Sequence, residues 1–220
     1  MSLANYGDLK TAIAGWLVRA DLTARIPDFI QLAEIRINRE LTRIGAGELN
    51  STSITTTAEA VDLPADFNGA RRVAIVDSRT WPIEYRTPEQ MWIEYPALYA
   101  ARPRVFTILG KDGAGGVNQI AFRPIPDAAY TVSLLYYKKV ATLVGGADAG
   151  TNWFMTSYPD AYLYASLLEA TPYIQNDARV ALWQGAYTQS MQDIADADKK
   201  QRYSGSVLRV SNSTVLLNGN

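Results

Sequence analysis

The feature that most constrains this chain is a predicted helix over residues 158–174 that has no polar face. Its apolar positions recur at helical spacing and also fill the adjoining faces: Ala161, Tyr162, Leu163, Tyr164, Ala165, Leu167 and Leu168. A helix that is apolar nearly all round belongs in the interior of a fold, because an exposed side would leave apolar surface in water. Pro159 and Asp160 suit its first turn, where a missing N–H is tolerated and a negative charge is favoured.

A second predicted helix, over residues 177–200, follows directly and is amphipathic. Its apolar stripe consists of Val180, Trp183, Ala186 or Tyr187, Met191 and Ile194. Its other side is rich in glutamine, aspartate and lysine. Because the first helix needs a cover and the second offers one apolar face, we expect the second to lie over the first. Leu163, Leu168 and Trp183 are therefore predicted core residues.

Two further helices are predicted near the start of the chain, over residues 6–20 and 26–44. The apolar stripe of the second consists of Ile26, Ile30, Ala33, Ile37, Leu41 and Ile44. Ile30, Ile37 and Leu41 lie along this stripe and join the predicted core. The remaining positions carry Glu34, Arg36, Asn38, Arg39, Glu40 and Arg43, a pattern typical of a solvated face.

The residue pattern changes after Gly47, where β-branched residues and turn signals replace helical spacing. Strands are predicted over residues 51–57, 60–64, 72–76, 81–85, 106–109, 119–123 and 130–138. Pro82 places its strand at an edge or a bulge, because proline cannot donate to a strand ladder. Thr87 and Gln90 predict a capped helical turn between the hairpins.

The predicted fold is therefore α+β. A helical bundle forms from N-terminal helices (residues 1–47) and C-terminal helices (residues 142–203), and an antiparallel β domain (residues 48–141) is inserted between them. A flexible, glycine-rich return to the helices is expected at residues 145–150. An extended tail, residues 204–220, ends the chain.

The tail has no helical stripe and little charge, but it is not uniformly polar. Its apolar residues are Val207, Leu208, Val210, Val215, Leu216 and Leu217. One interpretation is a frayed terminus. The other is a docking segment that adds a strand to the sheet edge of another chain. We expect the second, with the segment disordered in the free monomer because the ordering of each residue costs conformational entropy.

Composition removes the commonest catalytic designs. The chain has 220 residues but neither histidine nor cysteine, so the usual general base, thiolate chemistry and the commonest metal ligands are absent. The formal net charge is −1, so no global positive field attracts nucleic acid. We therefore expect no enzyme, no cofactor and no metal site. No apolar run reaches the length of a membrane span, and no membrane partner is expected.

Three local patterns have both a functional and a structural interpretation. The glycine-rich residues 110–116 superficially resemble a phosphate loop but lack its Gly-Lys-Ser/Thr ending, which favours a mobile hairpin turn. The acidic group Asp193, Asp196 and Asp198 has lysines beside it and is typical of a solvated helix end. Aromatic and basic residues alternate at Tyr95, Tyr99, Arg102 and Arg104, a pattern that can stack nucleotides or anchor a protein interface.

Several segments, in this order along the chain, resemble a family of head-to-tail adaptor proteins from tailed bacteriophages. They are residues 26–41, 63–67, 82–85, 121–126 and 158–170. The resemblance implies a helical bundle with an inserted β domain and no known catalysis. It also implies a location in the neck of the virion, after assembly in the host cytoplasm, and a ring, usually twelve-fold, beneath the portal.

The partners implied by the resemblance are the portal protein, neighbouring adaptor subunits, downstream tail or nozzle proteins, and genomic DNA that passes through the lumen without sequence-specific binding. We expect the tail after residue 203 to dock on the portal or on a neighbouring adaptor. The alternative function is a phage-encoded DNA-binding or DNA-processing accessory factor. That alternative needs a basic face, for which the sequence offers local clusters: Arg71 with Arg72, Arg102 with Arg104, and Lys199 and Lys200 with Arg202.

Overall fold

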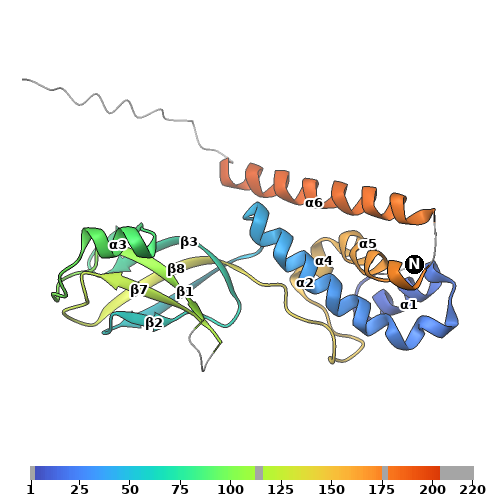
Figure 1. The fold of residues 1–220 in the computed structure, drawn as a ribbon, viewed down its shortest axis with the longest axis horizontal. Helices are drawn as coiled ribbons and strands as arrows, with labels where there is room; N and C mark the ends of the chain where they lie inside the picture. The colour runs from blue at the N-terminus through green and yellow to red at the C-terminus, as the bar shows by residue number, and fades with distance from the viewer. Residues whose placement is uncertain (1–2, 112–115, 175–177, 204–220) are drawn as a thin grey trace, which may run out of the picture.

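The computed structural model describes residues 3–111, 116–174 and 178–203, and it consists of a helical region and a β-sandwich that lie side by side (Figure 1). The predicted α+β class is confirmed. The helical region combines residues from both ends of the chain, whereas the sandwich is built from the middle. Helix α6 runs along one side of the helical region, and its C-terminal end points toward the sandwich (Figure 1).

The helical region holds helices α1 (Tyr6–Leu17), α2 (Ile26–Ile44), α4 (Trp153–Ser157), α5 (Pro159–Glu169) and α6 (Arg179–Tyr203), with short 3-10 helices at Ala20–Arg25 and Thr171–Tyr173. Helix α5 contacts α1, α2, α4 and α6, so it lies at the centre of this region. Its buried residues are Ala161, Tyr162, Leu163, Ala165, Ser166, Leu167 and Leu168. The absence of a polar face in the sequence thus corresponds to an enclosed helix.

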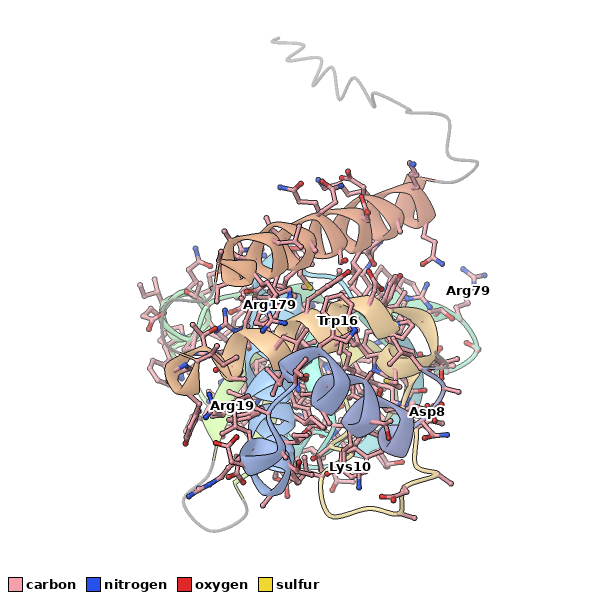
Figure 2. The ribbon with its side chains drawn as sticks, turned by 90° about the vertical axis from the view of Figure 1, so that its right-hand side faces the viewer. Asp8, Lys10, Trp16, Arg19, Arg79 and Arg179 are labelled. Atoms are coloured by element: carbon pink, nitrogen blue, oxygen red, sulfur yellow. The ribbon has the colours of Figure 1, made fainter. Side chains whose placement is uncertain are left out.

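One core unites these helices. The residues expected at its centre are all buried in it: Ile30, Ile37, Leu41, Leu163, Leu168 and Trp183. Helix α6 contributes Trp183, Tyr187, Met191 and Ile194, so Tyr187 rather than the half-buried Ala186 completes its stripe. Figure 2 shows Arg179 beside Trp16, where its guanidinium donates to the Trp16 carbonyl oxygen at 2.7 Å and ties the start of α6 to α1.

The N-terminal helices depart from the predicted boundaries at one end. Helix α1 stops at Leu17, before the predicted end at residue 20, because Val18 adopts a left-handed conformation (φ 53°), and a 3-10 helix follows. Helix α2 has the predicted bounds, with Pro27 in its first turn and the left-handed Gly45 at its end. Helix α4 was not predicted, because five residues carry too little periodicity to recognise.

The glycine-rich return at residues 145–150 is held in place rather than loose, which corrects the expectation of a flexible link. The backbone N–H groups of Tyr6 and Gly7 donate to the carbonyl oxygens of Gly150 and Asp148, each at 2.8 Å. Lys10 Nζ also lies 2.6 Å from Asp148 Oδ1. The segment therefore satisfies backbone donors in the first turn of α1 that have no partner within the helix.

Glu34 is buried, contrary to the prediction that the polar positions of α2 form a solvated face. Its side chain is only 4% exposed. Its Oε1 accepts hydrogen bonds from the Tyr162 hydroxyl and the Leu143 backbone N–H, each at 2.7 Å. Burial, reinforced by the negative charge of Glu34, raises the pKa of the Tyr162 phenol. Arg36, another of these polar residues, forms an ion pair with Glu169 of α5 at 2.6 Å.

The predicted β domain in the middle of the chain consists of two four-stranded sheets. The first has the order β1 (Leu49–Thr56), β8 (Tyr130–Lys138), β3 (Phe67–Val76), β4 (Thr80–Pro82). The second has the order β2 (Ala60–Asp62), β7 (Asn118–Arg123), β6 (Val105–Lys111), β5 (Glu84–Tyr85). Their inner faces share a core that includes Val132 and Leu134 from the first sheet and Ile120 and Phe122 from the second.

The predicted strand at residues 81–85 divides between these sheets. Trp81 and Pro82 pair with β3, whereas Glu84 and Tyr85 pair in parallel with β6. Ile83, at the crossing point, is buried in the sandwich core. The crossing follows because Pro82 cannot donate to a longer ladder and Ile83 gains burial between the sheets. After it, helix α3 (Pro88–Glu94) begins with the predicted capping box of Thr87 and Gln90.

Two side chains of α2 join the regions through hydrogen bonds to residues at or next to the sandwich. Asn38 of α2 accepts from the Val140 N–H at 2.8 Å and donates to the Val140 carbonyl oxygen at 3.3 Å. Thr42, one turn later, donates to Asn68 at the start of β3 at 2.8 Å. These contacts position the sandwich against the C-terminal half of α2.

Candidate interaction surfaces

Within residues 80–100 the sandwich exposes six large apolar side chains. We call them the aromatic set: Trp81, Tyr85, Trp92, Ile93, Leu98 and Tyr99. Trp92 and Ile93 are 57% and 79% exposed, although they lie in a helix whose other face buries Met91. Helix α3 lies in the part of the sandwich away from the helical region (Figure 1). Exposed aromatic and large aliphatic side chains are enriched at protein interfaces.

Charged side chains beside the aromatic set are paired with one another. Arg86 lies 2.8 Å from Glu84 and 3.1 Å from Glu94, and the hydrogen bond to Glu84 is the main reason that its pKa is raised. Arg102 lies 2.9 Å from Asp77 and stacks over the Trp81 ring at 4.9 Å. The pKa of Asp77 is lowered, chiefly by a hydrogen bond from the Arg79 backbone N–H. This mixture of signs resembles the polar rim of a protein interface.

The sequence had indicated a different group here, namely Tyr95, Tyr99, Arg102 and Arg104. The structure separates its members: Tyr95 is half-buried against the small core around Met91, whereas Tyr99 is 49% exposed. The aromatic partner of Arg102 is Trp81, which the pattern had not included. Exposure of Trp92 and Ile93 was also missed, because a capping box predicts where a helix starts but not which face meets solvent.

A groove opens on one side of the sandwich, where the chain crosses from β4 to β5. Its volume is about 450 Å³, and it is lined by Ala70, Arg71, Arg72, Val73, Pro82, Ile83, Tyr85, Phe106 and Ile108. Tyr85 and Phe106 stack edge to face, with ring centroids 5.6 Å apart. The groove is therefore an apolar opening into the sandwich, with two arginines at its rim.

The helical region exposes a separate group of apolar side chains. Leu32 and Ile35 of α2 are 49% and 50% exposed and lie one turn apart, on the side of the helix opposite its buried stripe. Leu182 of α6 is 68% exposed. Residues three or four apart share a helix face, so Leu32 and Ile35 present one apolar strip to solvent.

The acidic and basic clusters noted in the sequence form no assembled site. Asp193 accepts from Gln189, and Asp196 lies 3.4 Å from Lys199. Within residues 3–111, 116–174 and 178–203, no three acidic side chains gather as metal ligands. Each basic cluster has one side chain engaged within the chain: Arg71 with Tyr137, Arg102 with Asp77, and Lys199 with Asp196.

Two sequence-based expectations lie largely outside the described residues. They are the tip of the hairpin at residues 112–115 and the apolar tail at residues 204–220. Among the helices that the structure does describe, none is long and apolar enough to cross a membrane.

The sequence of the chain matches a known protein family. Residues 4–211 match the model of a protein family described as SU10 adaptor protein. The matched range includes the helical region, the sandwich and the start of the tail. A search of curated proteins finds no match to the chain.

Proposed function

Because this chain belongs to the SU10 adaptor protein family, we propose that it is the structural head-to-tail adaptor of a tailed bacteriophage. Copies of the chain form a ring beneath the portal protein in the neck of the virion. The ring extends the conduit for DNA, and tail or nozzle proteins dock on its far side. The observation that carries this proposal is the family match, which spans both the helical region and the sandwich rather than one motif.

The surfaces of the chain support this division of contacts. An adaptor has to hold neighbouring copies, the portal and tail proteins at the same time, so it needs several separate binding surfaces. The exposed strip of Leu32 and Ile35 on α2 suits contact between neighbouring copies. The aromatic set of the sandwich suits a tail protein, since aromatic anchors within a polar rim dominate the energy of many interfaces. Residues 204–220 complete the arrangement by docking on the portal or on a neighbouring adaptor.

The proposal is tested by the mass of the purified chain, alone and after mixing with the portal protein of the same phage. A ring or a portal-bound ring, with a mass that is a multiple of the single chain, is the expected result. A chain that remains single under both conditions contradicts the proposal. Replacing Leu32 and Ile35 by serine should weaken assembly. The matched change of Leu182 to serine, also at an exposed helical position, should have the smaller effect.

DNA binding by the free chain is the alternative outcome. It would draw on the basic clusters around Arg71, Arg102 and Lys199, although each of these side chains already has a partner within the chain. Duplex affinity that falls steeply with salt would favour an accessory DNA-binding factor, because such a slope counts the phosphates neutralised. Weak binding with little salt dependence is expected of an adaptor that only surrounds DNA.

A further inference from the structure

The groove on the sandwich lies between two strand edges that the neighbouring short strands leave partly uncovered. In the described pairings, β4 covers Ala74–Val76 of β3, whereas Gly69, Ala70 and Arg72 pair with β8 and not with β4, with a register shift at Arg71. Likewise β5 covers Val105 and Phe106 of β6, and Thr107 and the residues after it pair with β7. Uncovered edges of this kind are templates for another strand.

The floor of the groove is apolar, so an added strand would also bury side chains. Val73, Ile83 and Phe106 are buried core residues at its base, and Ile108 is half-buried beside them. Alternate side chains of a strand point to opposite faces. A strand along β3 would therefore direct every second side chain into the opening between the sheets, where apolar residues gain most.

We propose that this groove receives residues Val215–Leu217 from the C-terminal segment of another copy of the chain. Residues 204–220 contain no proline, so every backbone position can join a strand ladder. With Val215 and Leu217 directed inward, Leu216 faces outward, and the receiving strand is β3 at Gly69–Arg72. This inference rests on the proposed ring, because it makes the tail a contact between neighbouring subunits.

The charge of the groove favours the stretch Val215–Leu217 over the other apolar stretch of the tail, Val207–Val210. The rim of the groove carries Arg71 and Arg72, both exposed. The stretch Val207–Val210 includes Arg209, whose like charge opposes docking beside this rim. The stretch Val215–Leu217 and its flanking Thr214 and Asn218 carry no charge.

Chain length permits the contact. Helix α6 ends at Tyr203, so Val215 follows after a linker that can extend about 3.3 Å per residue, or roughly 40 Å in all. That reach exceeds the roughly 30 Å diameter of a small domain, so the segment can extend beyond its own subunit. A tail-to-groove contact is heterologous, so its repetition around a ring closes on itself and gives each subunit one donor and one acceptor. A modest affinity per contact then multiplies over the ring.

The absence of cysteine from the chain permits a direct test by engineered disulfides. One population carries Arg72→Cys, and a second, labelled with ¹⁵N, carries Thr214→Cys. After the two are mixed, assembled and mildly oxidised, we expect a covalent dimer of one light and one heavy chain. Two matched pairs serve as controls: Ser206→Cys in place of Thr214→Cys, and Ser51→Cys on edge strand β1 in place of Arg72→Cys. Both should cross-link at least tenfold less.

A second comparison tests the segment itself. The chain that carries Thr214→Cys is given two further changes. Val215→Ser with Leu217→Ser should reduce the yield of the covalent dimer with Arg72→Cys about tenfold. Leu208→Ser with Val210→Ser should leave that yield unchanged. Preferred cross-linking to Ser51→Cys, or sensitivity to Leu208 and Val210 instead, overturns the inference. A ring that assembles without the Arg72 cross-link also overturns it and leaves the proposed function standing. Chains that neither assemble nor cross-link overturn both.

Discussion

The helical region and the sandwich bury their apolar residues to different degrees of completeness. In the helical region, α5 contacts four other helices, and seven of its eleven residues are buried. The sandwich has a two-sheet core, but one side opens as a groove, and α3 directs Trp92 and Ile93 into solvent. The contrast therefore lies in how the two cores are closed, since both regions also expose apolar side chains on their outer surfaces.

Buried polar groups reinforce the contrast. In the helical core, Glu34 accepts from the Tyr162 hydroxyl and the Leu143 backbone N–H, so its interactions lock α2 to α5 and to the segment that follows β8. In the sandwich, buried Arg123 pairs with the half-exposed Glu59 near the surface. A buried charge stabilises only when its partners are in place. The network around Glu34 is therefore expected to be the more sensitive of the two.

The largest effect is expected from Trp183→Ala, which removes a fully buried side chain from the helical core. The loss of a buried tryptophan should cost about 3–5 kcal/mol of unfolding free energy. Leu182→Ala, at the neighbouring position that is 68% exposed, is the matched control and should change stability by less than about 0.5 kcal/mol. Denaturant midpoints measure both. Equal midpoints for the two variants would show that Trp183 of α6 does not pack in the helical core.

A smaller effect is expected at Glu34. Glu34→Ala leaves the Tyr162 hydroxyl and the Leu143 N–H without their acceptor in the interior, which should cost about 1–3 kcal/mol. Glu34→Gln retains an acceptor oxygen of nearly the same shape and should cost less. Thermal or denaturant unfolding measures the difference. If alanine is tolerated as well as glutamine, the buried network is not what locks these segments together.

Stability should also fall at alkaline pH through Tyr162. Its pKa is raised above the ordinary value of about 10 by burial and by Glu34, so the folded chain retains a proton that the unfolded chain releases. The contribution of neutral Tyr162 to the free energy of unfolding is fully present below pH 10. As pH rises above 10, the free energy of unfolding falls by up to about 1.4 kcal/mol per pH unit. Tyr162→Phe should flatten the decline of stability above pH 10. Tyr99→Phe, at an exposed position, should retain the wild-type slope.

The smallest effect on stability is expected from serine at both Trp92 and Ile93, because neither side chain is buried. The free energy of unfolding should change by less than about 0.5 kcal/mol. Binding of the tail protein should weaken at least tenfold, as it would for interface anchors. Pull-down of tail protein by assembled rings measures this. Full binding by the double variant would show that the aromatic set is not the docking surface.

The parts of the fold that were predictable are those encoded by residues close together in the chain. The bounds of α2 follow from its apolar stripe between Pro27 and Gly45, and those of β8 follow from one unbroken run of strand-forming residues. The start of α3 follows from Thr87 and Gln90. Each of these signals acts within a few residues, where geometry and propensity operate together.

The features that were missed depend on distant residues. Burial of Glu34 requires Tyr162 and Leu143, which lie more than 100 residues away in the chain. The crossing at Ile83 depends on the presence of a second sheet to receive it. Exposure of the aromatic set is likewise a property of the assembled sandwich. Local sequence patterns contain none of these relations, so candidate interaction surfaces are harder to predict than the helices and strands that carry them.

If this chain connects the head of a phage to its tail, as proposed, particles that lack it should have no tails. The most direct test is low-resolution imaging of particles produced with the gene for this protein deleted, beside particles from the complemented deletion. We expect heads with portals but no attached tails, and normal particles when the protein is restored. Tailed particles of normal appearance in the absence of the protein would contradict it.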